Sequence, residues 1–338
     1  MNITTLAIDL AKRVFQLHGI DSEGKTILKK RLGRSELVEF IANLPPCMIG
    51  MEACGTAHYW GRKFQSLGHE VRLINPAFVK PYVKSNKNDY NDAEAICEAM
   101  TRPTMRFVPV KSVEQQDMQC LHRIREQLVG NRTALVNQIR GLLSEFGIIF
   151  PKEIQNIRKQ LPFIFDECQN ELSDFTKQLF RELYEDFLYL DKRIKACNSK
   201  IVMLFKADKR CQKIGEIPGV GVITATALVS AIGDPAMFKN GRALSAWIGL
   251  VPKQASSGGK NILLGISKRG DRYLRKLLIH GARSVVLRAA NKDDPRSQWI
   301  TELKNRRGMN KTIVAVANKN SRIVWAVLAK DQDYRHAA

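Results

Sequence analysis

The chain is poor in the residues that build disulfide frameworks and membrane spans. Its 338 residues include seven cysteines, an odd number with no Cys-x-x-Cys pair, which argues against a disulfide scaffold and a zinc site. No stretch of about 18 apolar residues occurs, so no transmembrane helix is expected. Met1–Thr5 lacks the basic-then-apolar layout of a signal peptide. We therefore expect a cytoplasmic protein with reduced thiols.

Acidic residues are also scarce relative to basic ones. The chain has 33 Asp and Glu against 54 Lys and Arg, a formal net charge of +21. Residues 1–100 are nearly balanced, with 13 basic and 11 acidic residues, whereas residues 253–322 have 17 basic and 4 acidic residues. Such asymmetry is typical of a nucleic-acid-binding surface. Membrane-surface binding is less favoured, because the Trp- and Phe-rich face of an interfacial helix is missing.

Apolar runs and turn residues predict an α/β domain at the N-terminus. Strands are expected at 3–10, 14–20, 26–31, 47–52 and 70–74, and helices from Ser35, near 56–68 and from Asp89 to about Met100. Ser35 is the expected N-cap of the first helix, and Pro45-Pro46 its stop. This order fits a mixed five-stranded sheet with flanking helices.

Four acidic residues of this domain stand where strands end or helices begin. Asp9 interrupts the apolar run 6–10, Glu52 closes the run 48–52, and Asp89 and Asp92 are spaced to share one helix face. Carboxylates in apolar strands are costly to bury unless they are paired or bind a cation. Each could instead be an edge residue or a helix cap. Their order along the chain is the layout of a ribonuclease-H-like nuclease domain with a divalent-metal site that acts on phosphates.

Two long amphipathic helices are expected in the middle of the chain, at 113–146 and 172–205, with a break marked by Pro151 and Pro162. They predict a helical hairpin that packs within the chain or pairs with another protomer as a coiled coil. The length of the apolar stripe favours dimerisation. The predicted domains are a catalytic domain at 1–112, a helical dimerisation segment at 113–206 and a mainly helical C-terminal domain at 207–338.

The C-terminal region begins with a glycine motif and continues with a basic segment. Residues 214–227 have the shape of a helix–hairpin–helix, in which Gly219 and Gly221 let the backbone approach a phosphate, although a plain helix–helix turn is the alternative. The loop 253–260 presents Ser256 and Ser257. It is a flexible linker, or it holds a serine nucleophile. The candidate phosphate-binding residues here are Lys253, Lys260, Lys268, Arg269, Arg272, Arg275 and Lys276.

Taken together, these motifs resemble a known family over nearly the whole chain. The motifs are Ile8-Asp9, Met51-Glu52, residues 87–93, Pro218-Gly219-Val220-Gly221, residues 249–252, residues 256–260 and residues 268–275. In this order they are similar to the DEDD transposases of bacterial insertion sequences, in insertion-sequence family 110, group 1111, which are relatives of the Piv-type DNA invertases.

The resemblance implies a RuvC-like catalytic domain, a coiled-coil dimerisation segment and a C-terminal transposase domain. It implies that Asp9, Glu52, Asp89 and Asp92 hold Mg²⁺, with Mn²⁺ as a substitute. It further implies that a serine, Ser257 in preference to Ser256, forms a covalent link to DNA. The implied partners are donor and target DNA, a structured non-coding bridge RNA that guides the enzyme, and further copies of the chain in a tetramer of two dimers. Action on DNA implies association with the nucleoid.

Three functions therefore remain open at the level of sequence. The first is an RNA-guided recombinase that uses serine. The second is a RuvC-like junction resolvase or DNA invertase without guide RNA, in which water is the nucleophile and the serines belong to a linker. The third is a nucleic-acid-binding protein whose acidic residues are structural; it is the least favoured, because four acids at these positions have no common structural reason.

Overall fold

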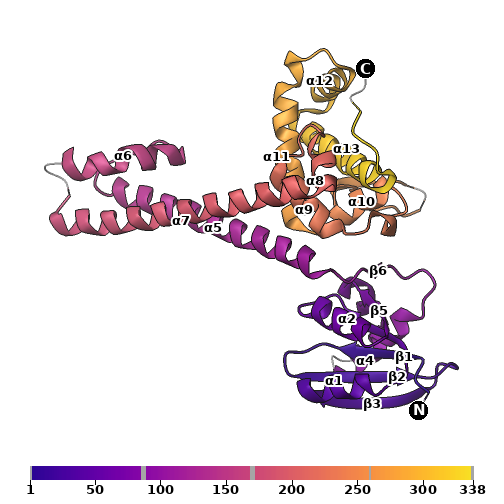
Figure 1. Cartoon of the computed structure of the whole chain (residues 1–338). Coiled ribbons are helices and arrows are strands. Elements are labelled where there is room, and N and C mark those ends of the chain that lie inside the picture. Colours follow the sequence, from indigo (N-terminus) through magenta and orange to yellow (C-terminus); the bar gives the residue numbers. More distant parts are fainter. Residues whose placement is uncertain (1, 85–88, 168–171, 259, 336–338) are drawn as a thin grey trace. The chain divides into compact units, whose positions relative to one another are not determined.

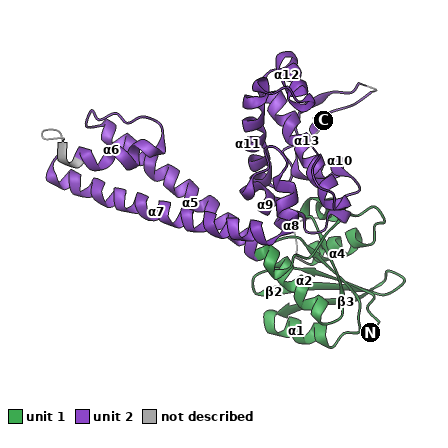
Figure 2. Cartoon of the chain, turned by 45° about the horizontal axis from the view of Figure 1, so that its top comes forward, with its two compact units in different colours: residues 1–116 green, residues 117–338 purple. Residues whose placement is uncertain are grey.

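The computed structural model describes residues 2–84, 89–167, 172–258 and 260–335, without the side chains of residue 89 and residues 165–167. The chain forms two compact units, residues 1–116 and 117–338 (Figure 2). The boundary between them falls near the start of a long helix, α5 (Val113–Ser144). None of the helices in the described part of the chain combines the length and the apolarity that a membrane span requires.

Unit 1 is built on a mixed sheet of six strands in the order β3-β2-β1-β4-β5-β6 (Figure 1). The strands are β1 (Thr5–Asp9), β2 (Val14–Ile20), β3 (Thr26–Gly33), β4 (Met48–Glu52), β5 (Glu70–Ile74) and β6 (Phe107–Val108). β4 runs parallel to β1 and to β5, and the remaining pairs are antiparallel. The five strands predicted from the sequence are confirmed. The sixth was missed because two residues carry no periodicity.

Helices cover both faces of this sheet. They are α1 (Arg34–Ala42), α2 (Ala57–Ser66), α3 (Pro76–Val79), the short 3₁₀ helix η1 (Lys80–Tyr82) and α4 (Asp89–Met100). Leu6 and Ile8 of β1 point to the face covered by α1 and α2, where Trp60 lies fully buried. Ala7, between them, points to the opposite face and packs against α4. The alternation of β1 therefore divides the core into two layers.

The predicted N-cap of α1 is wrong. Gly33, not Ser35, precedes the helix, and the Gly33 backbone N–H donates to the Glu36 carboxylate at 2.6 Å. The glutamate thus satisfies a donor ahead of the helix, which is half of a capping box. Ser35 has the favoured cap chemistry, but it lies inside the first turn.

Residues 19–26 match the phosphate-binding pattern Gly-x-x-x-x-Gly-Lys-Thr, yet they form a hairpin turn between β2 and β3. The Asp21 carboxylate accepts from the backbone N–H groups of Glu23 and Lys25, and Gly24 has a φ of +81°. A phosphate-binding loop requires a strand followed by a helix whose amides face the phosphates. The hairpin lacks that helix, so the match does not indicate nucleotide binding.

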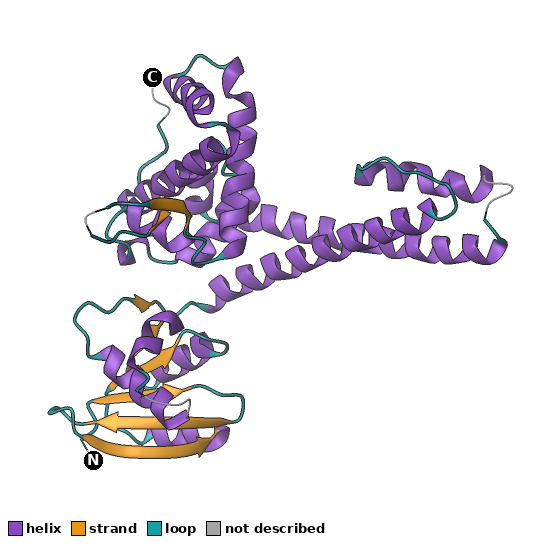
Figure 3. Ribbon diagram, turned by 180° about the vertical axis from the view of Figure 1, so that it is seen from behind, coloured by secondary structure: helices purple, strands orange, loops and turns teal. Residues whose placement is uncertain are grey.

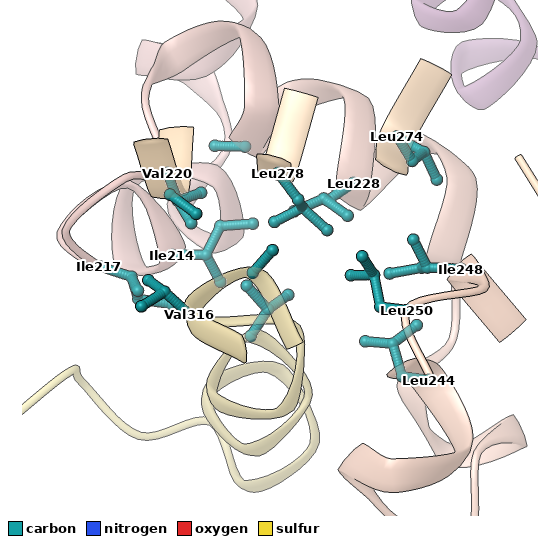
Figure 4. Close-up of a cluster of buried hydrophobic side chains, with 14 of the residues drawn as sticks. Ile214, Ile217, Val220, Leu228, Leu244, Ile248, Leu250, Leu274, Leu278 and Val316 are labelled. Carbon is teal, nitrogen blue, oxygen red and sulfur yellow. The ribbon is translucent and has the colours of Figure 1, made fainter. Parts of the chain in front are cut away.

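Unit 2 is mostly helical (Figure 3). After α5 come α6 (Ile154–Glu167), α7 (Asp174–Ala207), α8 (Lys209–Gly215), α9 (Val222–Ile232), η2 (Pro235–Met237), α10 (Gly241–Ile248), β7 (Pro252–Gln254), β8 (Leu263–Ile266), α11 (Arg272–Arg288), η3 (Ala289–Asn291), α12 (Pro295–Arg307) and α13 (Met309–Lys330). Its main core is shown in Figure 4, where side chains of α8 to α11 and α13 surround Leu228 and Leu278. A mixed α/β protein with a mainly helical C-terminal region is therefore confirmed.

The two long helices predicted from the sequence, α5 and α7, pack against each other within the chain. Arg125 of α5 donates to Asn198 of α7 at 2.6 Å, and Arg132 donates to Asp191 at 2.7 Å. Residue numbers rise along one helix as they fall along the other, so the pair is antiparallel. Asp191 is buried and also forms an ion pair with Arg158 of α6. Two guanidinium groups thus compensate one buried carboxylate.

The segment between α5 and α7 was expected to be a linker broken by proline, but Pro162 lies inside α6. Proline has no N–H to donate to the carbonyl four residues earlier, which belongs to Arg158. The Tyr184 hydroxyl of α7 donates to that same carbonyl at 3.0 Å. A tertiary hydrogen bond therefore replaces the missing helical one, and the sequence of α6 alone does not reveal it.

Gly219 and Gly281 bring the turn before α9 into backbone contact with α11. A Cβ on Gly281 would overlap the Gly219 carbonyl oxygen, and a Cβ on Gly219 would lie 2.9 Å from the Gly281 carbonyl oxygen. We expect Gly281→Ala to lower the free energy of unfolding of unit 2 by about 3 kcal/mol, because backbone cannot move aside as a side chain can. Thermal or denaturant unfolding measures this.

A matched control for this substitution is Gly130→Ala in the exposed middle of α5. An added Cβ there meets no atom within 4 Å. Alanine has the higher helix propensity, so this variant should be more stable than the wild type by about 0.5–1 kcal/mol. A loss of stability equal to that of Gly281→Ala would contradict the packing argument.

Candidate active site and serine hairpin

Two of the predicted carboxylates lie at one edge of the sheet of unit 1. Asp9 is the last residue of β1, and Glu52 is the last residue of β4. These strands are parallel neighbours in which Ile8 pairs with Met51, so both carboxylates come at adjacent positions where the strands end. Both residues are partly exposed. The sequence pattern of an apolar run followed by an acid thus places two acids side by side.

Helix α4 brings a third carboxylate to the same face. Ala7 pairs with Gly50, two residues before Asp9 and Glu52 respectively, so the side chains of Ala7, Asp9 and Glu52 point to the face that α4 covers. Gly50 has no Cβ, and an added one would overlap the Met100 side chain. Small residues on the strands therefore let α4 lie close to the sheet, and Asp92 is on its first turn.

The electrostatics of Glu52 show that the charges of Asp9 and Asp92 act on this carboxylate. Burial raises the pKa of Glu52 most, and the charges of Asp9 and then Asp92 raise it further. Like charges brought together disfavour the ionised form of each. Such an arrangement costs free energy unless a cation is bound, and it is common at functional sites.

The fourth predicted carboxylate, Asp89, is the first residue of α4, but its side chain lies outside the described residues. Among the side chains that are described, no three His, Cys, Asp or Glu form a group that could hold a metal ion. The donors are nonetheless of the type that Mg²⁺ takes, which binds through one or two carboxylates and keeps several waters. Asp9, Glu52 and Asp92 therefore fit a divalent cation by their chemistry.

Gln16 is a further residue of this site that the sequence analysis missed. It lies directly opposite Asp9 in the β1–β2 pairing, so the two side chains share a face. Gln16 is only 5% exposed, and its Oε1 accepts no hydrogen bond within the described part of the chain. A buried amide oxygen without a donor is costly and calls for a partner such as water or a cation. The available signal was a polar residue inside the apolar strand 14–20.

The two predicted serines lie on an exposed hairpin of unit 2. β7 and β8 pair antiparallel, and the connection between them carries Ser256 and Ser257. The Ser256 hydroxyl accepts from the Gln254 amide at 2.9 Å and donates to the Asn261 amide oxygen at 3.1 Å. The Ser257 backbone carbonyl accepts from the Lys260 N–H at 3.1 Å. The expected flexible loop is thus part of a hydrogen-bonded hairpin, because its polar side chains pair across it.

The base of this hairpin is held by the motifs on either side of it. The backbone N–H of Ser267 donates to the carbonyl of Val251 at 2.7 Å, and that of Lys268 donates to the carbonyl of Gly249 at 3.1 Å. Arg275 of α11 donates to the carbonyl of Ile248 at 2.9 Å. A Cβ on Gly249 would overlap the backbone of Arg269. The two segments therefore pack backbone to backbone and anchor the serines to the helical core.

The predicted phosphate-binding residues fall into two groups. Exposed basic side chains on or near the hairpin are Lys253, Lys260, Lys268, Arg269 and Arg272. Arg275 instead binds the Ile248 carbonyl, and Lys276 forms an ion pair with Glu126 of α5. The latter two side chains thus have partners within the chain.

The predicted helix–hairpin–helix corresponds to α8, a short turn and α9. Gly219 has a φ of +90° and packs on Gly281. Backbone conformation and packing within the protein therefore already require glycine at this position. Gly221 is exposed, has extended backbone before α9 and has no atom near its missing Cβ. Of the two glycines, Gly221 therefore has the free space that would let a phosphate approach its backbone.

Comparisons with known proteins identify the family. A family model described as transposase IS116/IS110/IS902 matches residues 211–298, and a model of DEDD transposases matches residues 6–148. A probable family 20 transposase of Pseudomonas aeruginosa is 48% identical over 99% of both chains. The chain belongs to the IS116/IS110/IS902 transposase family. The resemblance read from the motifs is thereby confirmed, and the chain is a DNA-acting enzyme of the transposase class.

Further relatives of this transposase widen the comparison. The transposase for insertion sequence element IS1111A of Coxiella burnetii is 47% identical, covering 100% of this chain and 93% of that protein. The pilin gene-inverting protein of Moraxella bovis is 24% identical over 99% of this chain and 98% of its own length. The DEDD transposase model, over residues 6–148, spans Asp9, Glu52 and Asp92. The IS116/IS110/IS902 model, over residues 211–298, spans the β7–β8 hairpin that carries Ser256 and Ser257, called the serine hairpin below. Transposase domains of the DEDD type typically use a divalent metal ion, as the carboxylates suggest.

Proposed function

We propose that this transposase carries out RNA-guided, Mg²⁺-dependent, site-specific DNA recombination with serine as the nucleophile. The observation that carries the metal-dependent part is the convergence of Asp9, Glu52 and Asp92 on one face of the sheet, with the raised pKa of Glu52 as its electrostatic mark. Asp89 opens the same helix as Asp92 and completes the proposed set of ligands. When bound, Mg²⁺ or Mn²⁺ would neutralise developing charge on the scissile phosphate.

The strand order of unit 1 supports a RuvC-like, ribonuclease-H-like assignment for it. Three antiparallel strands are followed by two strands parallel to the first, in the order β3-β2-β1-β4-β5. Carboxylates at the ends of β1 and β4, with another on the helix that covers them, support this assignment. Fold alone does not assign a reaction; the carboxylate convergence gives the assignment its chemical content.

Ser257 is the proposed nucleophile, because Ser256 is bound within the hairpin by Gln254 and Asn261. The Ser257 Oγ forms a bond to phosphorus, its proton passes to solvent, and one phosphorus–oxygen bond of the DNA breaks. The departing DNA oxygen takes up a proton as a free hydroxyl. The phosphoserine ester keeps the bond energy, so the hydroxyl of another strand can displace the serine without a nucleotide cofactor. Lys253 and Lys260 lie on the same hairpin to bind the phosphates.

The guide and the assembly belong to the proposal as well. A structured bridge RNA would pair with donor and target DNA, and the strongly basic segment 253–322 offers charge for either nucleic acid. The exposed apolar residues Phe175, Leu179 and Tyr189 along α7 support pairing of this helix with another protomer as a coiled coil. Two such dimers would form the tetramer, in which the carboxylates of one protomer act with the serine of another.

The proposed function is tested by trapping a covalent product. Purified protein is mixed with supercoiled DNA that carries the ends of its element, with and without Mg²⁺ and with and without co-expressed RNA from the element's non-coding flank. After denaturation, we expect a protein–DNA band that requires both Mg²⁺ and RNA. An adduct without RNA would refute guidance by RNA but leave the serine mechanism standing. Nicked DNA without an adduct would show that water is the nucleophile, as in a junction resolvase or an invertase without guide RNA.

A further inference from the structure

Unit 2 contains a large open groove whose lining includes none of the individual residues named from the sequence as phosphate-binding candidates. The groove has a volume of about 1470 Å³ and is lined by α10, by α13 and by β8 of the serine hairpin. Trp299 of α12 also lines it. The lining residues of α13 recur at Lys311, Ala315, Arg322 and Ala326, so one long face of that helix forms the floor.

The groove is cationic, with one of its cations, Lys319, 4.3 Å from the centroid of the Trp299 ring. Arg242, Lys311, Lys319 and Arg322 line it, and none of the described residues that line it is Asp or Glu. Burial lowers the pKa of Lys319 most, and the charges of Arg296 and Arg322 lower it further. Positive side chains are thus crowded together although repulsion opposes this, which is the electrostatic form of a site for a polyanion.

The wall of the groove formed by β8 is apolar and exposed. Leu263 is 67% exposed and Leu264 is 53% exposed, although both are large apolar side chains. A duplex presents its phosphates and keeps its base faces stacked inside. A single strand presents phosphates and free base faces together, and proteins bind it with a cationic track beside apolar or aromatic surfaces. The pairing of cations and leucines across this groove therefore fits a single strand better than a duplex.

We propose that this groove binds one strand of DNA with unpaired bases and leads it to the serine hairpin. The phosphates would lie along Lys311, Lys319 and Arg322, and the bases would pack on Leu263 and Leu264. The choice of DNA rests on the proposed function, because the hairpin whose strand forms the wall also carries Ser257. A strand in the groove would thereby lie against the base of the hairpin that carries the residue that would attack it.

The test measures equilibrium binding, which does not require the serine reaction. Fluorescence anisotropy would follow binding of a short single-stranded oligothymidylate and of a duplex of equal length, over a range of salt concentrations. We expect Lys311→Gln combined with Arg322→Gln to weaken single-strand binding about tenfold. The same pair should reduce the slope of log affinity against log salt by about 1.4, because each phosphate that is no longer neutralised lowers the slope by about 0.7. Duplex binding should change much less.

Two further variants separate the contributions of charge and apolar surface. Arg306→Gln combined with Arg307→Gln removes the same charge from exposed positions of α12 outside the groove, and it should leave single-strand binding within about twofold of the wild type. Leu263→Ser combined with Leu264→Ser should weaken single-strand binding about tenfold with an unchanged salt slope, because this pair packs on bases and neutralises no phosphate. An unfolding transition equal to that of the wild type would show that a variant keeps its fold.

Several outcomes would overturn the proposal. Equal effects of the groove pair and the α12 pair would show a diffuse basic surface and no site. Equal loss of duplex binding would show that the groove does not select single strands, and a preference for an RNA oligonucleotide of the same sequence would assign the groove to RNA. If DNA binding is unchanged while the oligomeric state shifts, the groove binds a second copy of the chain. If the groove variants bind DNA normally while wild-type protein forms the adduct, the groove proposal fails and the proposed function stands.

Discussion

Ser257→Ala is expected to abolish the covalent protein–DNA adduct, with a loss of at least about 10³-fold in the rate of its formation. The ester can form only at a hydroxyl, and in this hairpin the Ser257 residue is exposed while the hydroxyl of Ser256 bridges Gln254 and Asn261. A denaturing gel of the reaction with labelled DNA measures the adduct. DNA binding by the variant should equal that of the wild type, because the hairpin base does not involve this side chain.

Ser256→Ala is the matched control for Ser257→Ala, since it removes the same group one residue away. It should keep the adduct with a rate reduced by about tenfold, because the variant loses the hydrogen bonds that order the hairpin, each with a net contribution of about 1 kcal/mol. Asn261→Ala removes the same bridge from the other side and should match it. A complete loss in Ser256→Ala, with activity in Ser257→Ala, would assign the nucleophile to Ser256. Full adduct in both variants would exclude this pair of serines.

Local sequence patterns predict unit 1 well because each of its strands is bounded by its own turn chemistry. Runs such as 48–52 are apolar almost throughout and fit buried strands of a covered sheet. The errors occur where a hydrogen bond that the residue type alone does not reveal decides the local structure. Pro162 reads as a helix breaker until Tyr184 of α7 is known to bind the carbonyl that the proline leaves free. Ser35 has the residue type of an N-cap, but the Gly33 N–H donates to the Glu36 carboxylate and Gly33 is the N-cap.

The candidate site divides in the same way. Asp9 and Glu52 are predictable as neighbours because parallel strands that both end in an acid place those acids at one edge. The groove of unit 2 is not predictable from the sequence, because Arg242, Leu263 and Lys319 come from three elements with no shared periodicity. Net charge predicted that segment 253–322 binds nucleic acid, but not which cations have partners within the chain. Arg275 binds the Ile248 carbonyl, and only the structure reveals that.

Asp92→Asn is expected to lower the metal-dependent cleavage of DNA by at least about 10³-fold and, without metal, to stabilise unit 1. The loss follows because a metal that contributes several kcal/mol to the transition state would lose a charged ligand. The gain in stability follows because the pKa of Glu52 is raised by burial, by the charge of Asp9 and by the charge of Asp92. Removing the charge of Asp92 removes part of this repulsion. Thermal unfolding with and without Mg²⁺ separates these effects. At a concentration a hundredfold above its Kd, the cation should stabilise the wild type by about 2.7 kcal/mol and the variant by far less.

The pH dependence of the stability of the metal-free protein tests the same repulsion among the carboxylates. Because the folded-state pKa of Glu52 is raised, the folded protein holds a proton that the unfolded chain has already lost in the window between the ordinary and the raised pKa. The metal-free wild type therefore loses stability as pH rises through that window, and Asp92→Asn should lose less because one of the repelling charges is gone. Glu98→Gln, which removes an acid of α4 paired with Arg102, is the matched control and should keep both cleavage and the pH profile. If Glu98→Gln and Asp92→Asn behave alike, the carboxylates at the strand ends are structural and the metal site lies elsewhere.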